Sequence, residues 1–256
     1  MQTKIHFKNK FFGLLLIAAH ALQAQIINVE SLRMVTDTTG WSGTVQLQAS
    51  LKKNVNEQFK IGNHIHIQYK LPKHLFLFVN HLGFERIDGS DFTNDAMQHL
   101  RYNYKFAKKW TAEAFIQNQF NAVSKIEYRR LGGMGLRWKL TQSEKYKFYL
   151  GNHVMYEEEK TKEDNPHHNK AWRNSAYLSF SLYFNDHTSL ISTTYFQPNF
   201  RNFNDYRTSH QSALKFKVFK NLAFVTTFNF AYDEFPVTGI PQKEYELSNG
   251  LVYTFD

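Results

Sequence analysis

Two histidine pairs in the sequence have spacings that could hold a metal ion. His64 and His66 lie two residues apart in a segment where apolar and polar residues alternate. In a β-strand both side chains would project to one face about 7 Å apart, and such a pair can chelate zinc or copper when a third ligand crosses over. His167 and His168 lie near the acidic run at 157–159. Neither pair has a complete ligand set, so we expect no metal site and no other cofactor.

Hydrolytic catalysis would need a serine nucleophile and a histidine base within hydrogen-bonding distance of each other. Ser209 and His210 are adjacent, so a strand would point them to opposite faces. Ser175, beside Asn174, could approach His153 across a hairpin. Such combinations arise readily in a chain with 12 histidines, and polar residues that satisfy one another are the simpler interpretation. We expect no catalytic residues and no enzymatic activity, with a lipid-modifying enzyme as a distant alternative.

Three clustered glycines, Gly132, Gly133 and Gly135, resemble part of a phosphate-binding loop. The segment lacks the Lys-Ser or Lys-Thr ending of such loops, and no helical pattern follows that could direct a helix dipole at a phosphate. In a strand, these glycines instead predict a bulge, a bend or the close approach of another element.

The elements that position all these residues are β-strands. Apolar residues alternate with polar ones from Trp41 to the last residues of the chain, for example at Val45, Leu47 and Leu51. Phe, Trp and Tyr make up 16% of the residues, whereas the chain has only 12 Gly and 5 Pro. Alternation with an aromatic-rich apolar side is typical of a barrel in lipid, because lipid-facing and lumen-facing residues alternate along each strand. We therefore predict an all-β fold, an antiparallel transmembrane β-barrel.

There are about twelve alternating segments. This even number agrees with the preference of bacterial single-chain barrels. They are 43–51, 59–71, 74–84, 95–106, 110–120, 127–140, 145–156, 172–184, 188–197, 206–218, 221–232 and 243–255. Short links at 72–73, 107–109, 141–144, 185–187 and 220–221 alternate with longer ones at 85–94, 157–171, 197–205 and 233–242. The first external link, 52–57, is an exception because it is also short. Periplasmic turns are short and external loops are long in such barrels, so this order predicts periplasmic N- and C-termini.

The basic residues on the polar sides of these strands are the main functional signal. This lumen basic cluster comprises Lys60, His64, His66, Lys70, Arg101, Arg129, Arg137, Lys139, Lys147, Arg173 and Lys215, with Lys105 and Lys217 on the same sides. Fewer acidic residues accompany them, so an open lumen would favour anions. The alternative is a lumen filled by its own side chains, with basic and acidic residues paired across it. Phe115, Tyr149, Tyr177 and Tyr183 on the polar sides favour this filled lumen.

The N-terminal residues predict export. Lys4, Lys8 and Lys10 precede a short apolar run that ends in a small residue, Ala24, which is the pattern of a cleaved signal peptide. We divide the chain into a signal peptide (1–24), a lead-in segment (25–40) that is a strand, a plug or a periplasmic extension, and the barrel (41–256). Without the three signal lysines, the formal charge falls from +9 to +6. The remaining positive residues are spread over many strands, so nucleic acid is not expected as a partner.

Several short motifs in the mature chain resemble one family. They are Trp41-Ser42-Gly43, Phe84-Glu85-Arg86 with Asp88-Gly89, Arg101-Tyr102-Asn103-Tyr104, the run from Arg129 to Leu136, Gly151, and the tail from Gly250 to Phe255. Their order is similar to that in DUF481, a domain-of-unknown-function family of small outer-membrane barrels that includes salt-induced outer-membrane proteins. The resemblance implies a barrel without an assigned enzymatic activity. Asp256 departs from the pattern, because such barrels commonly end on the aromatic residue that Phe255 supplies here.

Together these observations predict a porin-like protein in the outer membrane of a Gram-negative envelope. The expected role is structural or in envelope adaptation, with a filled or narrow lumen, and a narrow anion-preferring channel is the alternative. The expected partners are outer-membrane lipid, lipopolysaccharide and, through the C-terminal strand, the barrel-assembly machinery. The oligomeric state does not follow from the sequence.

Overall fold

The computed structural model describes residues 39–53, 56–141, 143, 145–163, 165–219 and 222–253. The predicted signal peptide and residues 25–38 of the lead-in segment lie outside this range. No helix in the described part of the chain is long and apolar enough to cross a membrane.

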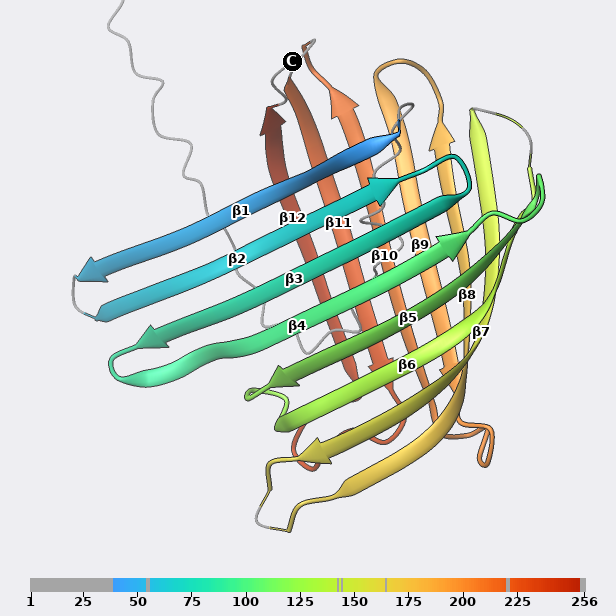
Figure 1. Ribbon diagram of the computed structural model, residues 1–256. Coiled ribbons are helices and arrows are strands. Elements are labelled where there is room, and N and C mark those ends of the chain that lie inside the picture. Colours follow the sequence, from blue (N-terminus) through green and yellow to red (C-terminus); the bar gives the residue numbers. More distant parts are fainter. Residues whose placement is uncertain are drawn as a thin grey trace, which may run out of the picture.

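Twelve antiparallel strands form one sheet in which each strand pairs with its neighbours in sequence (Figure 1). They are β1 (Gly40–Lys53), β2 (Glu57–Lys70), β3 (His74–Ile87), β4 (Ser90–Tyr104), β5 (Trp110–Asn121), β6 (Ile126–Lys139), β7 (Tyr146–Thr161), β8 (His168–Tyr183), β9 (Thr188–Pro198), β10 (Tyr206–Lys217), β11 (Leu222–Asp233) and β12 (Lys243–Tyr253). The predicted fold class and number of strands are confirmed.

The two faces of the sheet have the opposite polarity to those of a water-soluble protein. On β7, His153, Met155 and Glu157 are buried on the concave face, whereas Val154 between them is exposed on the convex face. The same holds on β6, where Met134 is 70% exposed. An apolar outer face and a polar interior are what a barrel in lipid requires.

Aromatic side chains gather on the outer face near both ends of the strands. Near the links at 71–73, 105–109, 140–145, 184–187 and 218–221, which we call the turn end, the rings of Trp110 and Trp138 stack with centroids 5.5 Å apart. At the opposite loop end, Tyr156 contacts Trp172 at 5.2 Å and Tyr206 contacts Tyr232 at 5.5 Å. Such rings match the aromatic girdles at the two membrane interfaces.

Two of the predicted long loops are wrong. The expected loop 85–94 is a hairpin whose turn is Asp88-Gly89, with φ angles of 49° and 80°. An Asp-Gly pair with positive φ at both positions is the typical two-residue hairpin turn. The expected loop 157–171 is likewise shorter, because β7 continues to Thr161 and β8 begins at His168. Beyond the membrane both faces of a strand meet water, so the ladder continues although the alternation of apolar residues stops.

The sheet curls so that its first strands lie across from its last ones (Figure 1). Side chains bridge the enclosed space: Arg207 on β10 contacts Glu157 on β7 at 2.6 Å, although two strands separate them in the sheet. Among the described residues, β1 pairs only with β2 and β12 only with β11, so these two strands are the edges of the sheet.

Candidate functional site

Apolar side chains fill part of the interior. Phe115 on β5, Leu131 on β6 and Met155 on β7 form one buried cluster. The ring of Tyr177 lies over Gly151 on the neighbouring strand, where any side chain would overlap it. Phe115 and Tyr177 are therefore buried in the lumen as the filled-lumen interpretation requires, whereas Tyr149 and Tyr183 lie nearer the turn end.

A carboxylate near the middle of the interior is surrounded by three partners. Glu113 accepts a hydrogen bond from the hydroxyl of Tyr177 at 2.9 Å and lies 3.1 Å from Nε2 of His153. Arg137 approaches the other oxygen of Glu113 at 3.6 Å. These contacts join β5, β6, β7 and β8, so one buried carboxylate links four consecutive strands on the inner face of the sheet.

The second polar group lies at the loop end, and we call it the arginine network. It consists of Arg129, Arg173, Arg207, Glu157, Glu159, Asp205 and Asp233. Glu157 is its centre: it is 1% exposed and lies 2.7 Å from Arg129, 3.5 Å from Arg173 and 2.6 Å from Arg207. Three guanidinium groups meet four carboxylates, so the network is charge-balanced to within one unit.

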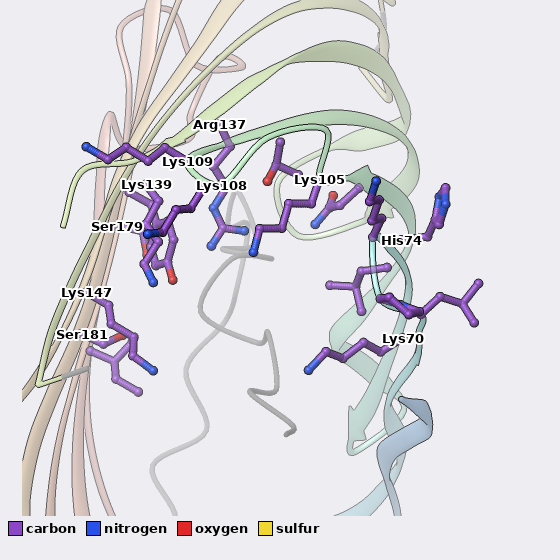
Figure 2. A pocket seen from close by; sticks show the side chains of 18 of the residues that line it. Lys70, His74, Lys105, Lys108, Lys109, Arg137, Lys139, Lys147, Ser179 and Ser181 are labelled. Carbon is purple, nitrogen blue, oxygen red and sulfur yellow. The ribbon is translucent and has the colours of Figure 1, made fainter. Parts of the chain in front are cut away.

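The third group is a hollow at the turn end, which we call the basic pocket. It has a volume of about 330 Å³, and Figure 2 shows its side chains. Its cationic lining residues are Lys70, Lys73, Lys105, Lys108, Lys109, Arg137, Lys139 and Lys147. No Asp or Glu is among the lining residues in the described part of the chain.

Aromatic rings hold two of these cations in place. The guanidinium of Arg137 lies 3.9 Å from the ring centroid of Tyr149, and the ammonium of Lys147 lies 5.7 Å from that of Tyr183. A cation–π contact orients a cation without cancelling its charge. Glu113 balances Arg137 from behind the lining, and the lysines keep the lining of the pocket positive.

The structure thus divides the predicted lumen basic cluster among several places. Lys70, Arg137, Lys139 and Lys147 line the basic pocket, whereas Arg129 and Arg173 belong to the arginine network. The remaining members, Lys60, His64, His66, Arg101 and Lys215, lie on the inner face elsewhere. Lys60 pairs with Glu85 at 3.4 Å, and Arg101 lies over the ring of Phe115 at 5.6 Å.

Sequence reasoning missed the lysines of the turns. Lys73, Lys108 and Lys109 lie in connections, where no alternation assigns a face, and the structure brings them to the same hollow as the strand residues. The sequence did contain a signal for this pocket, because lysines recur in several turns that all lie at one end of the barrel.

Neither of the serine and histidine combinations considered for hydrolysis has its serine hydroxyl hydrogen-bonded to its histidine. His153 contacts the backbone oxygen of Ser175 at 3.2 Å and Glu113 with its other nitrogen, while the Ser175 hydroxyl accepts a hydrogen bond from Gln197. Ser209 is buried on the inner face of β10, opposite to the face of His210.

An unpredicted polar cluster occupies the outer face of β9 and β10. His210 lies 2.8 Å from the hydroxyl of Ser212 and 2.8 Å from that of Thr194, and the hydroxyls of Ser212 and Ser192 are 2.9 Å apart. The spacing of two between His210 and Ser212 could have revealed it. The cluster lies in the central part of β10, and its members hydrogen-bond one another.

The histidine pairs do not assemble a metal site within the described residues, where no group of three or more His, Cys, Asp or Glu is placed to hold a metal ion. The ring of His64 lies 5.6 Å from that of His81, which contacts Asp95 at 3.0 Å. His168 contacts Glu158 at 2.8 Å.

The glycines of β6 permit close approach, as one of the sequence interpretations proposed. A side chain at Gly133 would meet the ring of Phe115, and one at Gly135 would overlap the backbone of β7 at Asn152. The register shifts on β6 lie elsewhere, near Ile126 and Tyr128, so the glycines mark no bulge.

Comparisons with known proteins agree with this architecture. The sequence profile of the family described as "Protein of unknown function, DUF481" matches residues 31–255. No curated protein matches the sequence significantly. Among solved structures, the NanC porin aligns with a TM-score of 0.51 and 9% identity, over 83% of this chain and 100% of that one. The toluene transporter TodX of Pseudomonas putida aligns with a TM-score of 0.40 and 10% identity, over 84% of this chain and 79% of that one. At this identity, the similarity to NanC shows a shared outer-membrane barrel fold.

Proposed function

The chain belongs to the DUF481 family, and from this premise we propose that it is an outer-membrane barrel with a closed lumen and a structural or envelope-adaptation role. Its export would use the predicted signal peptide. The turn end would face the periplasm, since the two longest links, 199–205 and 234–242, both lie at the opposite end.

The observation that carries this proposal is the arginine network. Arg207 on β10 contacts Glu157 and Glu159 on β7, and Arg173 on β8 contacts Asp205 beyond β9 through two hydrogen bonds of 2.8 and 3.1 Å. These buried pairs bridge segments that are not neighbours in the sheet, at the loop end of the interior. Opening the lumen there would separate buried opposite charges, which is costly.

The partners that fit this proposal are membrane components. The apolar outer face and its aromatic girdles suit lipid and lipopolysaccharide, and the C-terminal strand suits the barrel-assembly machinery. Neither a cofactor nor nucleic acid is part of the proposal.

A narrow anion-preferring channel is the second candidate, and the basic pocket favours it. Eight cations at the mouth of a pore would concentrate anions there. The arginine network would then have to rearrange for each passage.

Planar-bilayer recording of the refolded protein separates the two candidates. A closed lumen predicts no unitary current in low or in high salt. The channel predicts current steps with an anion-selective reversal potential, reduced in the variant K139Q/K147Q. Steady conductance of the unmodified protein would contradict the closed lumen.

A further inference from the structure

The described residues that line the basic pocket include many cations and no Asp or Glu. Eight cationic side chains from β2, β6, β7 and two turns line this one hollow. Glu113, which lies behind the lining, balances one of them, Arg137, at 3.6 Å. The arginine network of the same barrel, by contrast, matches three cations with four carboxylates. Crowded like charges repel one another, so an anion that enters this hollow lowers the free energy of the pocket.

The cations approach the hollow from different walls. Figure 2 shows Lys70 on one side and Lys147 on the other, with Arg137 and Lys105 between them. The hydroxyl-bearing residues Ser179 and Ser181 of β8 also line it. A ligand in the hollow would therefore meet positive charge from several directions and neutral donors from β8.

The size of the hollow limits the ligand. A volume of about 330 Å³ lies at the lower end of the range for small-molecule pockets, which is roughly 300–1,000 Å³. A single small anion would leave most of it to water, and a folded nucleic acid does not fit. A sugar-sized or headgroup-sized ligand does.

From charge, donor types and size together, we propose that the basic pocket binds a small ligand that carries phosphate groups. Lysine ammonium groups bind phosphate as point charges, and serine hydroxyls complete the shell. Arg137, whose guanidinium lies between Glu113 and the ring of Tyr149, belongs to the wall of the hollow. The ligand is either a soluble phosphate ester or the headgroup of a lipid, since both present the same chemistry. This site goes beyond the closed-lumen proposal, because the pocket exists at the turn end whether or not the lumen conducts.

The test measures binding of inorganic pyrophosphate to the purified full-length barrel in detergent by titration calorimetry. Pyrophosphate should bind, and its affinity should fall as salt rises, because screening weakens charge attraction. The variant K105Q/K139Q/K147Q should bind about 100-fold more weakly, since each lost lysine contact in a half-exposed pocket corresponds to roughly a fivefold change.

The matched control is K52Q/K162Q/K243Q, which removes the same charge from exposed positions at the loop end. It should bind pyrophosphate like the unmodified protein. Equal weakening in both triple variants would overturn the proposal, because it would show attraction to net charge alone. Absence of pyrophosphate binding to the unmodified protein, or equally tight binding of citrate, would also overturn the assignment of a phosphate site.

Two further measurements keep the test decisive. Heat-modifiable migration on gels shows whether the triple variant is folded, and the single variant K147Q should bind about fivefold more weakly if the triple variant does not fold. Nanodiscs distinguish the sources of phosphate: weaker pyrophosphate binding with phosphatidylglycerol than with phosphatidylcholine indicates that a lipid headgroup occupies the pocket, and equal affinity indicates a soluble ligand. Conductance plays no part in this readout, so failure of the closed-lumen proposal and failure of the phosphate site are distinguishable.

Discussion

Arg207 and Glu157 offer a direct test of whether the arginine network holds the lumen together. Glu157 is 1% exposed, and its carboxylate lies 2.6 Å from Arg207, which also contacts Glu159 at 3.1 Å and Asp233 at 2.7 Å. The pair joins β7 to β10, which are not neighbours in the sheet. The perturbation is a double-mutant cycle of Arg207→Met, Glu157→Gln and the double variant.

The expected magnitude follows from burial and distance. Two unit charges about 4 Å apart interact by about 4 kcal/mol at the effective dielectric constant of 20 that suits protein sites. Arg207→Met leaves two guanidinium groups with four carboxylates, so it should lose about 3–5 kcal/mol of unfolding free energy. Glu157→Gln leaves Arg207 with Glu159 and Asp233, so it should lose only about 1–3 kcal/mol. The double variant loses both at once, and its loss should be about 2 kcal/mol smaller than the sum of the single losses.

The assay is urea-dependent folding into lipid vesicles, followed by tryptophan fluorescence, because the chain has 4 Trp. The control is the exposed pair Lys160–Glu127, which has a similar distance of 2.8 Å on the neighbouring strands β7 and β6. Its disruption should cost less than about 1 kcal/mol, because water screens it. Additive losses for Arg207 and Glu157, or equal losses at the control pair, would refute the reasoning.

Three further predictions concern other parts of the barrel. Gly135→Ala should destabilise by about 1–3 kcal/mol, because the new methyl group overlaps the backbone of β7, whereas Gly132→Ala, with open space around it, should change unfolding free energy by less than about 0.5 kcal/mol; equal effects in vesicle folding would contradict the close approach. His210→Leu should lower stability in lipid vesicles by about 1–2 kcal/mol, because the hydroxyl of Thr194 loses its imidazole partner on an apolar face, and unchanged stability would show that the outer polar cluster does not support the fold. The pKa of the partly exposed Glu158 is lowered by its hydrogen bond with His168. This contact should therefore stay intact above the ordinary carboxyl pKa of about 4.3 and be lost only as pH falls through the lowered value, and an NMR titration with an ordinary or raised midpoint would contradict it.

The sequence was sufficient to predict the architecture because the two-residue alternation of apolar and polar side chains identifies the strands and their faces. Successive side chains of a strand point to opposite faces, so the alternation around Val154 on β7 or Ile61 on β2 assigns lipid and lumen residues without any knowledge of neighbours. The number of strands, the apolar outer face and the inward basic residues were predictable for this reason. The ends of strands were not: the hairpin at Asp88-Gly89 continues the ladder past the membrane, where the alternation no longer marks it.

Only the tertiary structure decided which inward charges meet. Arg207 and Glu157 are 50 residues apart, and their contact depends on the register of every strand pair between them and on the curvature of the sheet. Strand register and sheet curvature also give different surroundings to Arg129 and Lys139, two inward cations of β6. Arg129 contacts carboxylates of the arginine network, whereas Lys139 lines the basic pocket, which has no carboxylate among its described lining residues. A period of two fixes the face of a residue, but its height and its partners across the lumen are properties of the whole sheet.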